Sequence, residues 1–385
     1  MDALMLPSNW QRVRLGDIGK PCMCKRVMKH QTTRYGEIPF YKIGTFGNTA
    51  DAFISKKLFL EYKTKYSFPK KGDILISASG TIGRAVIYDG KPAYFQDSNI
   101  VWIDNDETLV KNDFLFYAYS NVKWNTEHTT ILRLYNDNFR NTLIPLPPLN
   151  EQIAIANILS DVDHYLYSLD ALILKKESVK KALSFELLSQ RKRLKGFNQA
   201  WQKVRLGDIA NYLTSNLSAE QITQQGKIKV YDVNNFIGYT NTTFISDKPY
   251  ISIVKDGSVG RVRILPPKTN ILSTMGALIA NHKTTTEFLF YLLSNFDFKN
   301  FTSGSIIPHI YFKDYKEKTI FLPPLNEQIA IANILSDLDH EIISLKNKKR
   351  QFENIKKALN HDLMSAKIRV LKKQNAPKVK DKPAF

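Results

Sequence analysis

The sequence predicts an α+β protein in which one unit occurs twice, a mixed α/β domain followed by a long helix. Three observations lead to this prediction. The segment LPPLNEQIAIANILSDVDH at 146–164 returns at 322–340 with one conservative change. An opening motif, WQRVRLGDI at 10–18, returns as WQKVRLGDI at 201–209. A heptad pattern of apolar residues follows each copy of the first motif. A duplicated unit of this kind predicts two similar surfaces in one molecule.

Composition places the chain among globular proteins and favours an anionic partner. Its 385 residues suffice for two to three domains, and 43% hydrophobic against 24% charged residues supports substantial cores. The formal net charge of +19 favours nucleic acid first and an acidic membrane surface second. No run approaches about 18 apolar residues, and the first residues lack a signal-peptide pattern. We therefore expect a cytoplasmic protein without a membrane span.

Catalytic and metal sites find little support in the sequence. There is no Gly-x-Gly-x-x-Gly after a strand, no Walker lysine loop and no amino-methyltransferase box. Cys22 and Cys24 supply half of a tetrahedral zinc site, so two reduced thiols in a β-rich segment are expected. The Asp and His residues of 161–164 and 337–340 fall on predicted helices, where a surface position or subunit contact is favoured. We expect no enzymatic activity, metal or cofactor in this chain.

The two copies differ in the segments between their constant ends. The opening motifs begin at positions 10 and 201 and the later motifs at positions 146 and 322, so the first middle segment is the longer one. Runs such as DILIS at 73–77 and IVWI at 100–103, punctuated by Gly, Asp and Asn, predict mixed α/β structure. FLFYAYS at 114–120 and FLFYLLS at 288–294 predict one short helix in each copy. A constant frame with diverged middles indicates one scaffold with two different recognition surfaces.

Each LPPLNEQ motif predicts the start of a long helix. Prolines at 145, 147 and 148 end the preceding element, Asn150 is expected to cap the helix, and Glu151 suits its first turn. Apolar residues then recur at steps of four and three, which predicts packing along another helix. These positions are Ile155, Leu159, Val162, Leu166, Leu169 and Ile173 in the first copy, and Ile331, Leu335, Leu338, Ile342 and Leu345 in the second.

Near the middle of the two helices, an apolar residue in one heptad pattern corresponds to a lysine in the other. Lys176 of the first helix corresponds to Phe352 of the second, and Ile173 corresponds to Lys349. We hypothesise that the two helices pair with each other more specifically than either pairs with itself. The alternative is that each helix packs only on its own domain. A helix from Asn150 to Leu194 is about 65–70 Å long at 1.5 Å per residue, which favours a stalk.

These motifs carry a family resemblance. The LPPLNEQIAIANIL box with its long helix, present twice, and the two WQ-VRLGDI openings resemble the specificity (S) subunits of type I restriction–modification systems. The resemblance spans about 10–371. It implies two target recognition domains, each reading half of a split DNA site, and helices that pair as an antiparallel coiled coil with a pseudo-twofold internal repeat. We place the domains at 1–148 and 197–324, the helices at 149–196 and 325–371, and a basic, disordered tail at 372–385.

The resemblance also implies partners. Methyltransferase (M) subunits dock on the helices, and two near-identical helix motifs favour two of them. S-adenosylmethionine would come with the M subunits, and ATP and Mg²⁺ with restriction (R) subunits. Docking and helix pairing are assigned to Asn150, Glu151, Gln152, Ile155, Leu159 and Leu166, and in the second copy to Asn326, Glu327, Gln328, Ile331, Leu335 and Ile342.

A Gly-x-x-Gly-Arg turn in each middle segment is the first candidate for DNA contact. Glycines let the backbone approach a phosphate or base edge, and the arginine can pair with phosphate or guanine. The alternative is an ordinary tight β-turn. The residues are Gly80, Thr81, Gly83 and Arg84 in GTIGR, and Gly257, Ser258, Gly260 and Arg261 in GSVGR.

Two further groups are candidates for DNA contact. Lys25, Arg26 and Lys29 form a basic cluster that suits phosphate contact, or else a solvated loop. A second group mixes aromatic, cationic and amide side chains, as base-edge recognition requires, or else forms polar ends of a buried strand. Its members are Tyr41, Lys42 and Thr45, aligned with Tyr231, Asn234 and Asn235.

The sequence thus predicts a non-catalytic subunit that recognises a bipartite, asymmetric DNA site and scaffolds M and R subunits. The alternative is a coiled-coil scaffold that joins two protein partners without recognising DNA.

Overall fold

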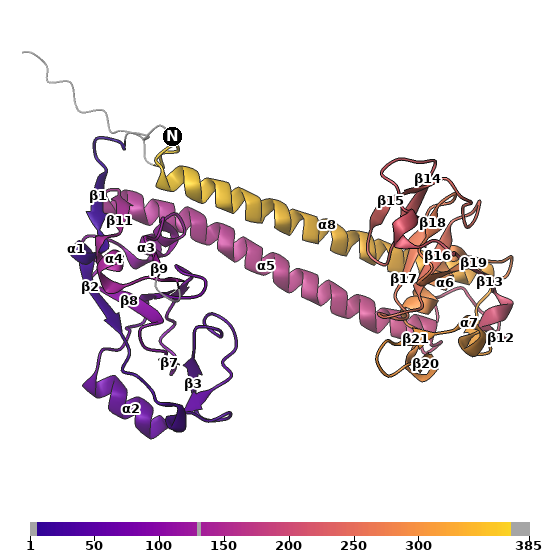
Figure 1. Ribbon diagram of the computed structural model, residues 1–385, viewed down its shortest axis with the longest axis horizontal. Helices are drawn as coiled ribbons and strands as arrows, with labels where there is room; N and C mark the ends of the chain where they lie inside the picture. Colours follow the sequence, from indigo (N-terminus) through magenta and orange to yellow (C-terminus); the bar gives the residue numbers. More distant parts are fainter. Residues whose placement is uncertain (1–5, 129–131, 371–385) are drawn as a thin grey trace, which may run out of the picture. The chain divides into compact units, whose positions relative to one another are not determined.

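The computed structural model describes residues 6–128 and 132–370, and there the fold is an α+β architecture that occurs twice (Figure 1). The expected tail at 372–385 lies outside the described residues. The chain divides into two compact units. Unit 1 comprises Met1–Ser168 and Lys349–Phe385, and unit 2 comprises Leu169–Lys348.

Unit 1 is built around a four-stranded antiparallel sheet with strand order β2-β8-β5-β6. Successive residues of a strand point to opposite faces. Ile74 and Ile76 therefore join a core that includes helix α3 (Asn112–Tyr119), whereas Leu75 joins a second core. Burial of both faces explains the apolar runs DILIS and IVWI, from which β5 and β8 were predicted. The strands are β2 (Gly19–Met23), β8 (Ile100–Asn105), β5 (Ile74–Ser77) and β6 (Ala85–Ile87).

A smaller sheet with order β4-β3-β7 contributes to the second core. Strand β3 pairs antiparallel with β4 and parallel with β7. Helix α2 (Lys56–Lys65) is capped by Ser55, whose hydroxyl accepts from the Leu58 N–H at 3.2 Å. Cys24 belongs to the same core, and burial raises the pKa of its thiol to about 12. The strands are β3 (Ile38–Tyr41), β4 (Phe53–Ile54) and β7 (Tyr94–Phe95).

The two ends of the unit 1 domain meet in a strand pair. Strand β1 (Gln11–Arg14), from the opening motif, pairs antiparallel with β11 (Leu143–Leu146). Since β11 precedes the long helix, this pair places the opening motif beside the start of that helix. The other elements are α1 (Leu15–Ile18), η1 (Lys29–Gln31), β9 (Glu127–His128), β10 (Leu132–Arg133) and α4 (Asn136–Asn141).

Unit 2 repeats this plan. Strands β12 (Gln202–Arg205) and β22 (Thr319–Leu322) pair as β1 and β11 do. The four-stranded sheet has the order β13-β19-β16-β17 and the smaller sheet β15-β14-β18. Their strands are β13 (Ala210–Thr214), β19 (Met275–Ala280), β16 (Tyr250–Val254), β17 (Val262–Leu265), β15 (Phe236–Thr240), β14 (Ile228–Tyr231) and β18 (Asn270–Ile271). The other elements are η2 (Leu206–Asp208), η3 (Ala219–Gln221), α6 (Thr286–Ser294), η4 (Lys299–Phe301), β20 (Thr302–Ser303), β21 (His309–Ile310) and α7 (Phe312–Tyr315).

The domains of the two units differ most in the connection from the small sheet to the large sheet, which joins β4 to β5 in unit 1 and β15 to β16 in unit 2. In unit 1 this connection runs from 55 to 73 and includes α2. In unit 2 it runs only from 241 to 249 and contains no helix. This connection therefore accounts for most of the extra length of the first middle segment.

Two helices of 40 residues, α5 (Leu149–Leu188) and α8 (Leu325–Met364), run through both units. At 1.5 Å per residue each is about 60 Å long. Helix α5 begins before Asn150, because the Pro148 carbonyl already accepts from the Gln152 N–H at 2.9 Å. The predicted cap is therefore wrong: Asn150 lies in the first turn, where its Oδ1 accepts from the Glu151 N–H at 3.0 Å. Among the residues described, none of the helices combines the length and hydropathy of a membrane span.

Helix α5 also ends before the predicted Leu194. The chain turns at Gln190, whose φ is +62°, and the Lys192 N–H donates to the Glu186 carbonyl at 3.1 Å. Helix α8 ends in the same way at Ala366, with φ +56°. A left-handed residue closed by such a backward hydrogen bond terminates a helix. Because the residue is not glycine here, the sequence does not mark the end.

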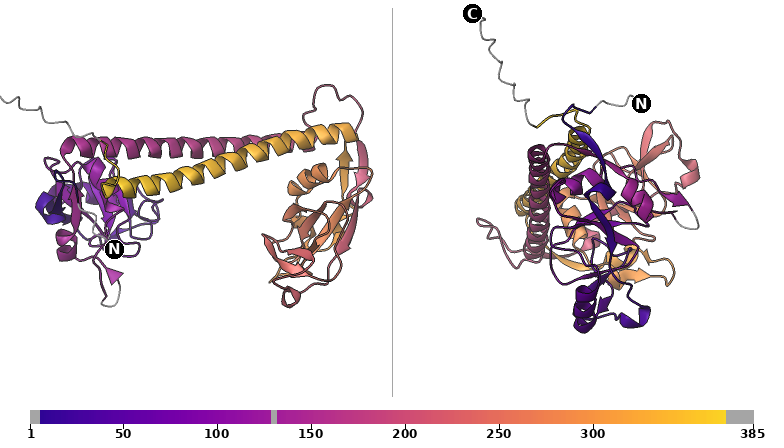
Figure 2. Two further views of the ribbon diagram at one scale, coloured as in Figure 1. Left: turned by 90° about the horizontal axis from the view of Figure 1, so that it is seen from above. Right: turned by 90° about the vertical axis from the view of Figure 1, so that its left-hand side faces the viewer.

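Ion pairs show that α5 and α8 pack antiparallel in each unit, side by side in Figures 1 and 2. Later residues of α5 face earlier residues of α8. The Nζ-to-carboxylate pairs are Lys176–Glu341 at 2.7 Å and Lys180–Asp339 at 2.5 Å in unit 2, and Lys356–Asp163 at 2.5 Å in unit 1. The predicted fold class, with its internal repeat and antiparallel helices, is confirmed.

The predicted heptad positions divide between two kinds of packing. The early positions are at most 1% exposed and join the domain cores, as the alternative interpretation expected; they are Ile155, Leu159, Ile331 and Leu335. Later positions lie beside the ion pairs that join the helices. Of these, Leu169, Ile173 and Ile342 are buried and Leu166 is half-buried.

Candidate nucleic-acid interface

The first Gly-x-x-Gly-Arg turn connects β5 and β6. Gly80 and Gly83 have φ values of +65° and +82°, in the left-handed region that favours glycine. The Gly83 N–H donates to the Ser77 carbonyl at 2.9 Å, and the Ser77 N–H donates to the Arg84 carbonyl at 3.0 Å. A Cβ on Gly83 would lie 2.0 Å from Trp124 Nε1, so packing as well as backbone conformation requires glycine there.

The second turn, between β16 and β17, repeats this geometry. Gly257 and Gly260 have φ values of +84° and +80°. The Gly260 N–H donates to the Val254 carbonyl at 2.9 Å, and the Val254 N–H donates to the Arg261 carbonyl at 3.0 Å. Phe298 now lies behind the turn, 2.6 Å from a Cβ placed on Gly260. Two diverged middle segments thus build the same turn.

Both turns present polar groups to solvent. The exposed residues are Gly80, Thr81 and Arg84 in unit 1, and Gly257, Ser258 and Arg261 in unit 2. Each turn therefore offers open backbone, a hydroxyl and a guanidinium within a single short loop. Phosphate oxygens and base edges are bound by groups of these kinds.

The arginine of each turn is held by the loop that follows the first strand of the small sheet. Arg84 Nη2 donates to the Gly47 carbonyl at 3.3 Å and to Asn48 Oδ1 at 3.4 Å. Arg261 Nη2 donates to Asn234 Oδ1 at 3.0 Å. A guanidinium has five N–H donors, so each arginine keeps donors for another partner. The structure brings Arg261 and Asn234 together, two residues that the sequence singled out separately.

In unit 2 the loop after β14 forms a polar cluster around Asn234. Asp232 Oδ1 accepts from the N–H groups of Asn234 and Asn235 at 2.7 and 2.6 Å, which closes an Asx turn. Arg263 Nη1 donates to the Asn234 carbonyl at 2.9 Å, and the Arg263 guanidinium lies 5.3 Å from the centre of the Tyr231 ring. The Asn234 and Asn235 residues are exposed. This cluster combines cations, amides and an aromatic ring on one surface.

In unit 1 the aligned loop after β3 uses its polar groups internally. Thr45 Oγ1 accepts from the Lys42 N–H at 3.1 Å and thereby closes a turn. Lys42 Nζ lies 2.8 Å from Asp51 Oδ1, and the hydrogen bond from Lys42 lowers the pKa of Asp51. The Tyr41 ring stacks on Phe95 with 5.9 Å between centroids. The charge of Lys42 is therefore already paired, whereas Arg261 and Arg263 donate to the neutral oxygens of Asn234.

The predicted basic cluster lies on the surface of unit 1. Lys25, Arg26 and Lys29 are exposed. Lys25 Nζ lies 5.1 Å from the centre of the Tyr66 ring, a cation–π distance. Within the described residues, no hydrogen bond or ion pair joins these three side chains to the turn at 80–84. The structure does not assemble them with the turn into one site.

Two polar contacts beside the turns were not predicted. Arg133 Nη2 donates to the Ser98 carbonyl at 2.7 Å in unit 1, and His309 Nδ1 lies 2.7 Å from Asp256 Oδ1 in unit 2. Arg133 and His309 fall at equivalent positions when the two copies of the helix motif are aligned. That alignment is the sequence signal that relates them. Arg263 was also missed, although it follows Arg261 by two residues, at the start of strand β17 (Val262–Leu265).

The start of each long helix is tied to the opening motif by a buried carboxylate. Glu151 is 1% exposed and accepts from Trp10 Nε1 at 3.0 Å. Arg369 donates to both oxygens of Glu151, from Nε at 2.7 Å and Nη2 at 2.9 Å. Gln152, also 1% exposed, accepts from the Lys111 N–H at 2.8 Å.

Unit 2 reproduces this carboxylate site. Glu327 is fully buried and accepts from Trp201 Nε1 at 3.0 Å and from Arg193 Nε and Nη2 at 3.2 and 2.7 Å. Gln328 accepts from the Thr285 N–H at 3.1 Å. The four acidic and amide side chains assigned to docking therefore build the frame and present no surface to a partner. Their neighbours Asn150 and Asn326 are exposed.

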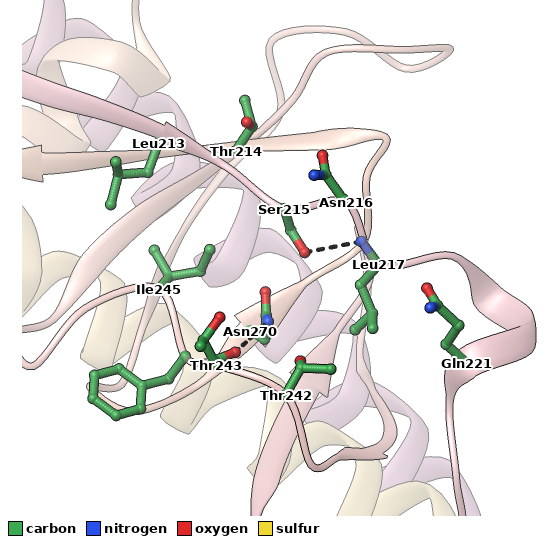
Figure 3. Close-up of a pocket in the computed structure, with 11 residues that line it drawn as sticks. Leu213, Thr214, Ser215, Asn216, Leu217, Gln221, Thr242, Thr243, Ile245 and Asn270 are labelled. Carbon is green, nitrogen blue, oxygen red and sulfur yellow. Dashed lines mark hydrogen bonds between the residues drawn. The ribbon is translucent and has the colours of Figure 1, made fainter.

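A hollow of about 330 Å³ in unit 2 lies apart from these contacts (Figure 3). Two of its polar side chains already have partners, since Asn270 Nδ2 donates to the Thr243 carbonyl at 2.6 Å and Ser215 Oγ accepts from the Leu217 N–H at 3.2 Å. All of its lining side chains are neutral. Without a charge to hold a phosphate, this hollow does not extend the candidate interface.

A sequence model described as the type I restriction modification DNA specificity domain matches the chain twice, at residues 7–176 and 198–354. A putative type I restriction enzyme specificity subunit of Haemophilus influenzae is 64% identical over 148 residues, which are 38% of each chain. The putative MjaX specificity subunit of Methanocaldococcus jannaschii is 29% identical over 406 residues, covering 95% of each chain. The MjaVIII specificity subunit of the same organism is 26% identical, covering 96% of this chain and 95% of its own.

Two solved structures share the fold. The S subunit of a type I restriction–modification system from M. genitalium superposes with a TM-score of 0.62 at 20% identity, covering 94% of this chain and 98% of that one. A chain from a structure on complex assembly and conformational transition of the type I system superposes with a TM-score of 0.56 at 16% identity, covering 94% of this chain and 98% of that one.

Proposed function

Because the chain belongs to the family of type I restriction–modification DNA specificity subunits, we propose that it recognises a bipartite, asymmetric DNA site without catalysing a reaction itself. The family supports DNA recognition rather than the alternative of a protein scaffold that does not contact DNA. One observation supports the asymmetry of the site: the same Gly-x-x-Gly-Arg turn occurs in both units, but the residues around it differ. A common turn places the same groups at DNA twice, and different surroundings select different bases.

The surroundings differ in charge. Beside Arg84, unit 1 offers the Gly47 carbonyl and Asn48, while Lys42 is paired with Asp51. Beside Arg261, unit 2 offers Asn234 and a second guanidinium, that of Arg263. Arginine suits guanine and asparagine suits adenine in the major groove. We therefore propose that each unit contacts one half-site and that the two half-sites differ in sequence.

Methylome sequencing of cells with and without the gene tests this proposal. The motif that loses methylation on deletion should have two parts of different sequence separated by a spacer. A perfect inverted repeat would contradict the asymmetry, and a methylome without any lost motif would contradict DNA recognition. Binding of the complex with M subunits should also depend steeply on salt, with a log–log slope near −9 for about ten phosphate contacts.

We propose that two M subunits dock on the repeated helix starts. Leu149 and Ile153 are 40% and 46% exposed, and their copies Leu325 and Ile329 are 45% and 49% exposed. Large apolar side chains that stay exposed in identical sequence on both copies are suited to one protein partner bound twice. The buried glutamates beside them hold these helix starts in place.

Native mass spectrometry of the complex with M subunits tests this docking. Ile153→Asp or Ile329→Asp alone should leave one M subunit bound, and the double variant should leave none. Leu174→Asp is the matched control, because Leu174 is 64% exposed on α5 and corresponds to Arg350 in the other copy. Loss of M subunits in the control as well, or full occupancy in the double variant, would contradict the assignment.

We also propose that S-adenosylmethionine enters with the M subunits, and ATP and Mg²⁺ with R subunits. The chain itself supplies recognition and spacing in the cytoplasm. Equilibrium dialysis of the purified chain with S-adenosylmethionine should show no saturable binding, whereas the chain with M subunits should bind it. Stoichiometric binding by the chain alone would overturn this division of labour.

A further inference from the structure

One layer of the α5–α8 helix pair differs in chemistry between the two units. In unit 1, the rings of Tyr165 and Phe352 lie 4.6 Å apart between centroids. In unit 2, Lys176 Nζ lies 2.7 Å from Glu341 Oε1. The alignment of the two helix motifs relates Tyr165 to Glu341 and Lys176 to Phe352. Equivalent positions therefore form an aromatic pair in one unit and an ion pair in the other.

Several neighbouring contacts of the helix pair are the same in both units, although the Lys346–Glu177 ion pair of unit 2, at 2.6 Å, aligns with Asp170 and Glu353. Asp163 pairs with Lys356 in unit 1, and their equivalents Asp339 and Lys180 pair in unit 2, all at 2.5 Å. The buried glutamates and their arginines are likewise equivalent. These repeated contacts would form equally well in an α5–α8 pair, an α5–α5 pair or an α8–α8 pair. They therefore do not distinguish α5–α8 pairing from pairing of like helices.

We propose that the layer of Tyr165, Phe352, Lys176 and Glu341 selects pairing of α5 with α8 against pairing of like helices from a second copy of the chain. In a like pair of α5 helices in the same register, Tyr165 faces Lys176 twice. In a like pair of α8 helices, Glu341 faces Phe352 twice. Both arrangements break the ion pair and the aromatic pair.

The two like pairs are not penalised equally. A lysine beside a tyrosine ring keeps some attraction through the ring electrons. A glutamate against a phenylalanine face keeps none, because the ring face is negative and the carboxylate loses its cation. Within this layer, the selection therefore acts most strongly against α8–α8 pairing. It concerns how the chain closes on itself and does not depend on whether DNA is recognised.

Exchange variants of the full-length chain test the proposal. Lys176→Phe with Phe352→Lys puts Tyr165 against Lys and Glu341 against Phe within one chain, while like helices gain Tyr–Phe and Glu–Lys pairs. The reciprocal exchange, Tyr165→Glu with Glu341→Tyr, has the same consequence. Each double variant should melt below the wild-type chain and shift by light scattering from the wild-type mass towards twice that mass. The fourfold variant restores Glu–Lys and Phe–Tyr pairs within one chain and should recover both wild-type values.

The control is Val162→Leu with Leu338→Val, an exchange at equivalent half-buried positions of the same two helices. It creates no mismatch and should leave mass and melting temperature unchanged. Double variants that keep the wild-type mass and melting temperature would overturn the proposal. If a double variant does not fold, the fourfold variant tests the proposal instead. A fourfold variant that fails to recover the wild-type mass and melting temperature would also overturn the proposal.

Discussion

Unit 1 and unit 2 are alike where they hold the long helices and different where they carry the candidate DNA contacts. The Trp–Glu–Arg contacts at the helix starts join the same atoms in both units, with donor–acceptor distances from 2.7 to 3.2 Å. The loops beside the two Gly-x-x-Gly-Arg turns each supply an asparagine Oδ1 to the arginine but differ in their charged groups, a Lys42–Asp51 ion pair in unit 1 and Arg263 in unit 2. The two copies therefore keep the contacts that fix the geometry and differ in the contacts that would select a ligand.

The largest expected effect comes from the shared part. Glu151→Ala and Glu327→Ala each remove a nearly fully buried carboxylate and leave an arginine and an indole N–H without their partner. Breaking a buried pair by removing one member costs about 3–5 kcal/mol. Both variants should lose stability by similar amounts, measured by urea unfolding.

Glu353→Ala provides the control for the buried glutamates. Glu353 is half exposed on α8 and pairs with Lys349 within one helix turn at 3.5 Å. Exposed pairs of this kind contribute about 0.3–0.5 kcal/mol. If Glu151→Ala and Glu327→Ala were as mild as this control, or differed strongly from each other, the frame would not be equivalent in the two units.

The sequence predicts the frame well, since repetition and heptad spacing are local signals. It predicts the helix ends and the role of the glutamates less well. Glu151 looks like a favourable first-turn residue, and its true partner Arg369 lies 218 residues away. Only the folded chain brings the two together. Likewise the Gly-x-x-Gly-Arg turns are visible in the sequence, whereas the loops that hold Arg84 and Arg261 are joined to them by long-range contacts.

The glycines of the turns offer the next test. Gly83→Ala and Gly260→Ala combine a left-handed backbone with a Cβ that would lie 2.0 Å from Trp124 or 2.6 Å from Phe298. Overpacking of this kind costs about 1–3 kcal/mol, in addition to the backbone strain. Thermal unfolding should show a loss of stability in both variants. Gly257→Ala meets no atom within 4 Å and should lose less, with strain alone; a loss equal to that of Gly260→Ala would show that packing behind the turn is unimportant.

Replacing the turn arginines tests whether the two units recognise separate half-sites. Arg84→Ala and Arg261→Ala should each weaken binding by about 1–3 kcal/mol and relax specificity at one half-site only, if each contacts a base. Competition binding with DNA libraries randomised in one half at a time measures this. Arg26→Ala, at an exposed position of the basic cluster, should instead weaken binding to all sequences and reduce the salt slope by about 1. Relaxed specificity at both half-sites from one arginine variant would break the assignment of one half-site to each unit.

The smallest effect concerns the paired lysine that distinguishes unit 1. The hydrogen bond from Lys42 holds the pKa of Asp51 below its usual range. A carboxyl whose pKa is lower in the folded chain adds stability above its unfolded pKa, and this stability is lost as the pH falls through the folded value. Because the pair is exposed, its contribution to stability is small. Carboxyl ¹³C titration should show the Asp51 pKa rising to its ordinary value of about 3.9 in Lys42→Ala, and Asp51→Asn should free the lysine and strengthen salt-dependent DNA binding. A titration unchanged in Lys42→Ala would mean that the lysine is not held, and that the loops of the two units differ less in available charge than their contacts indicate.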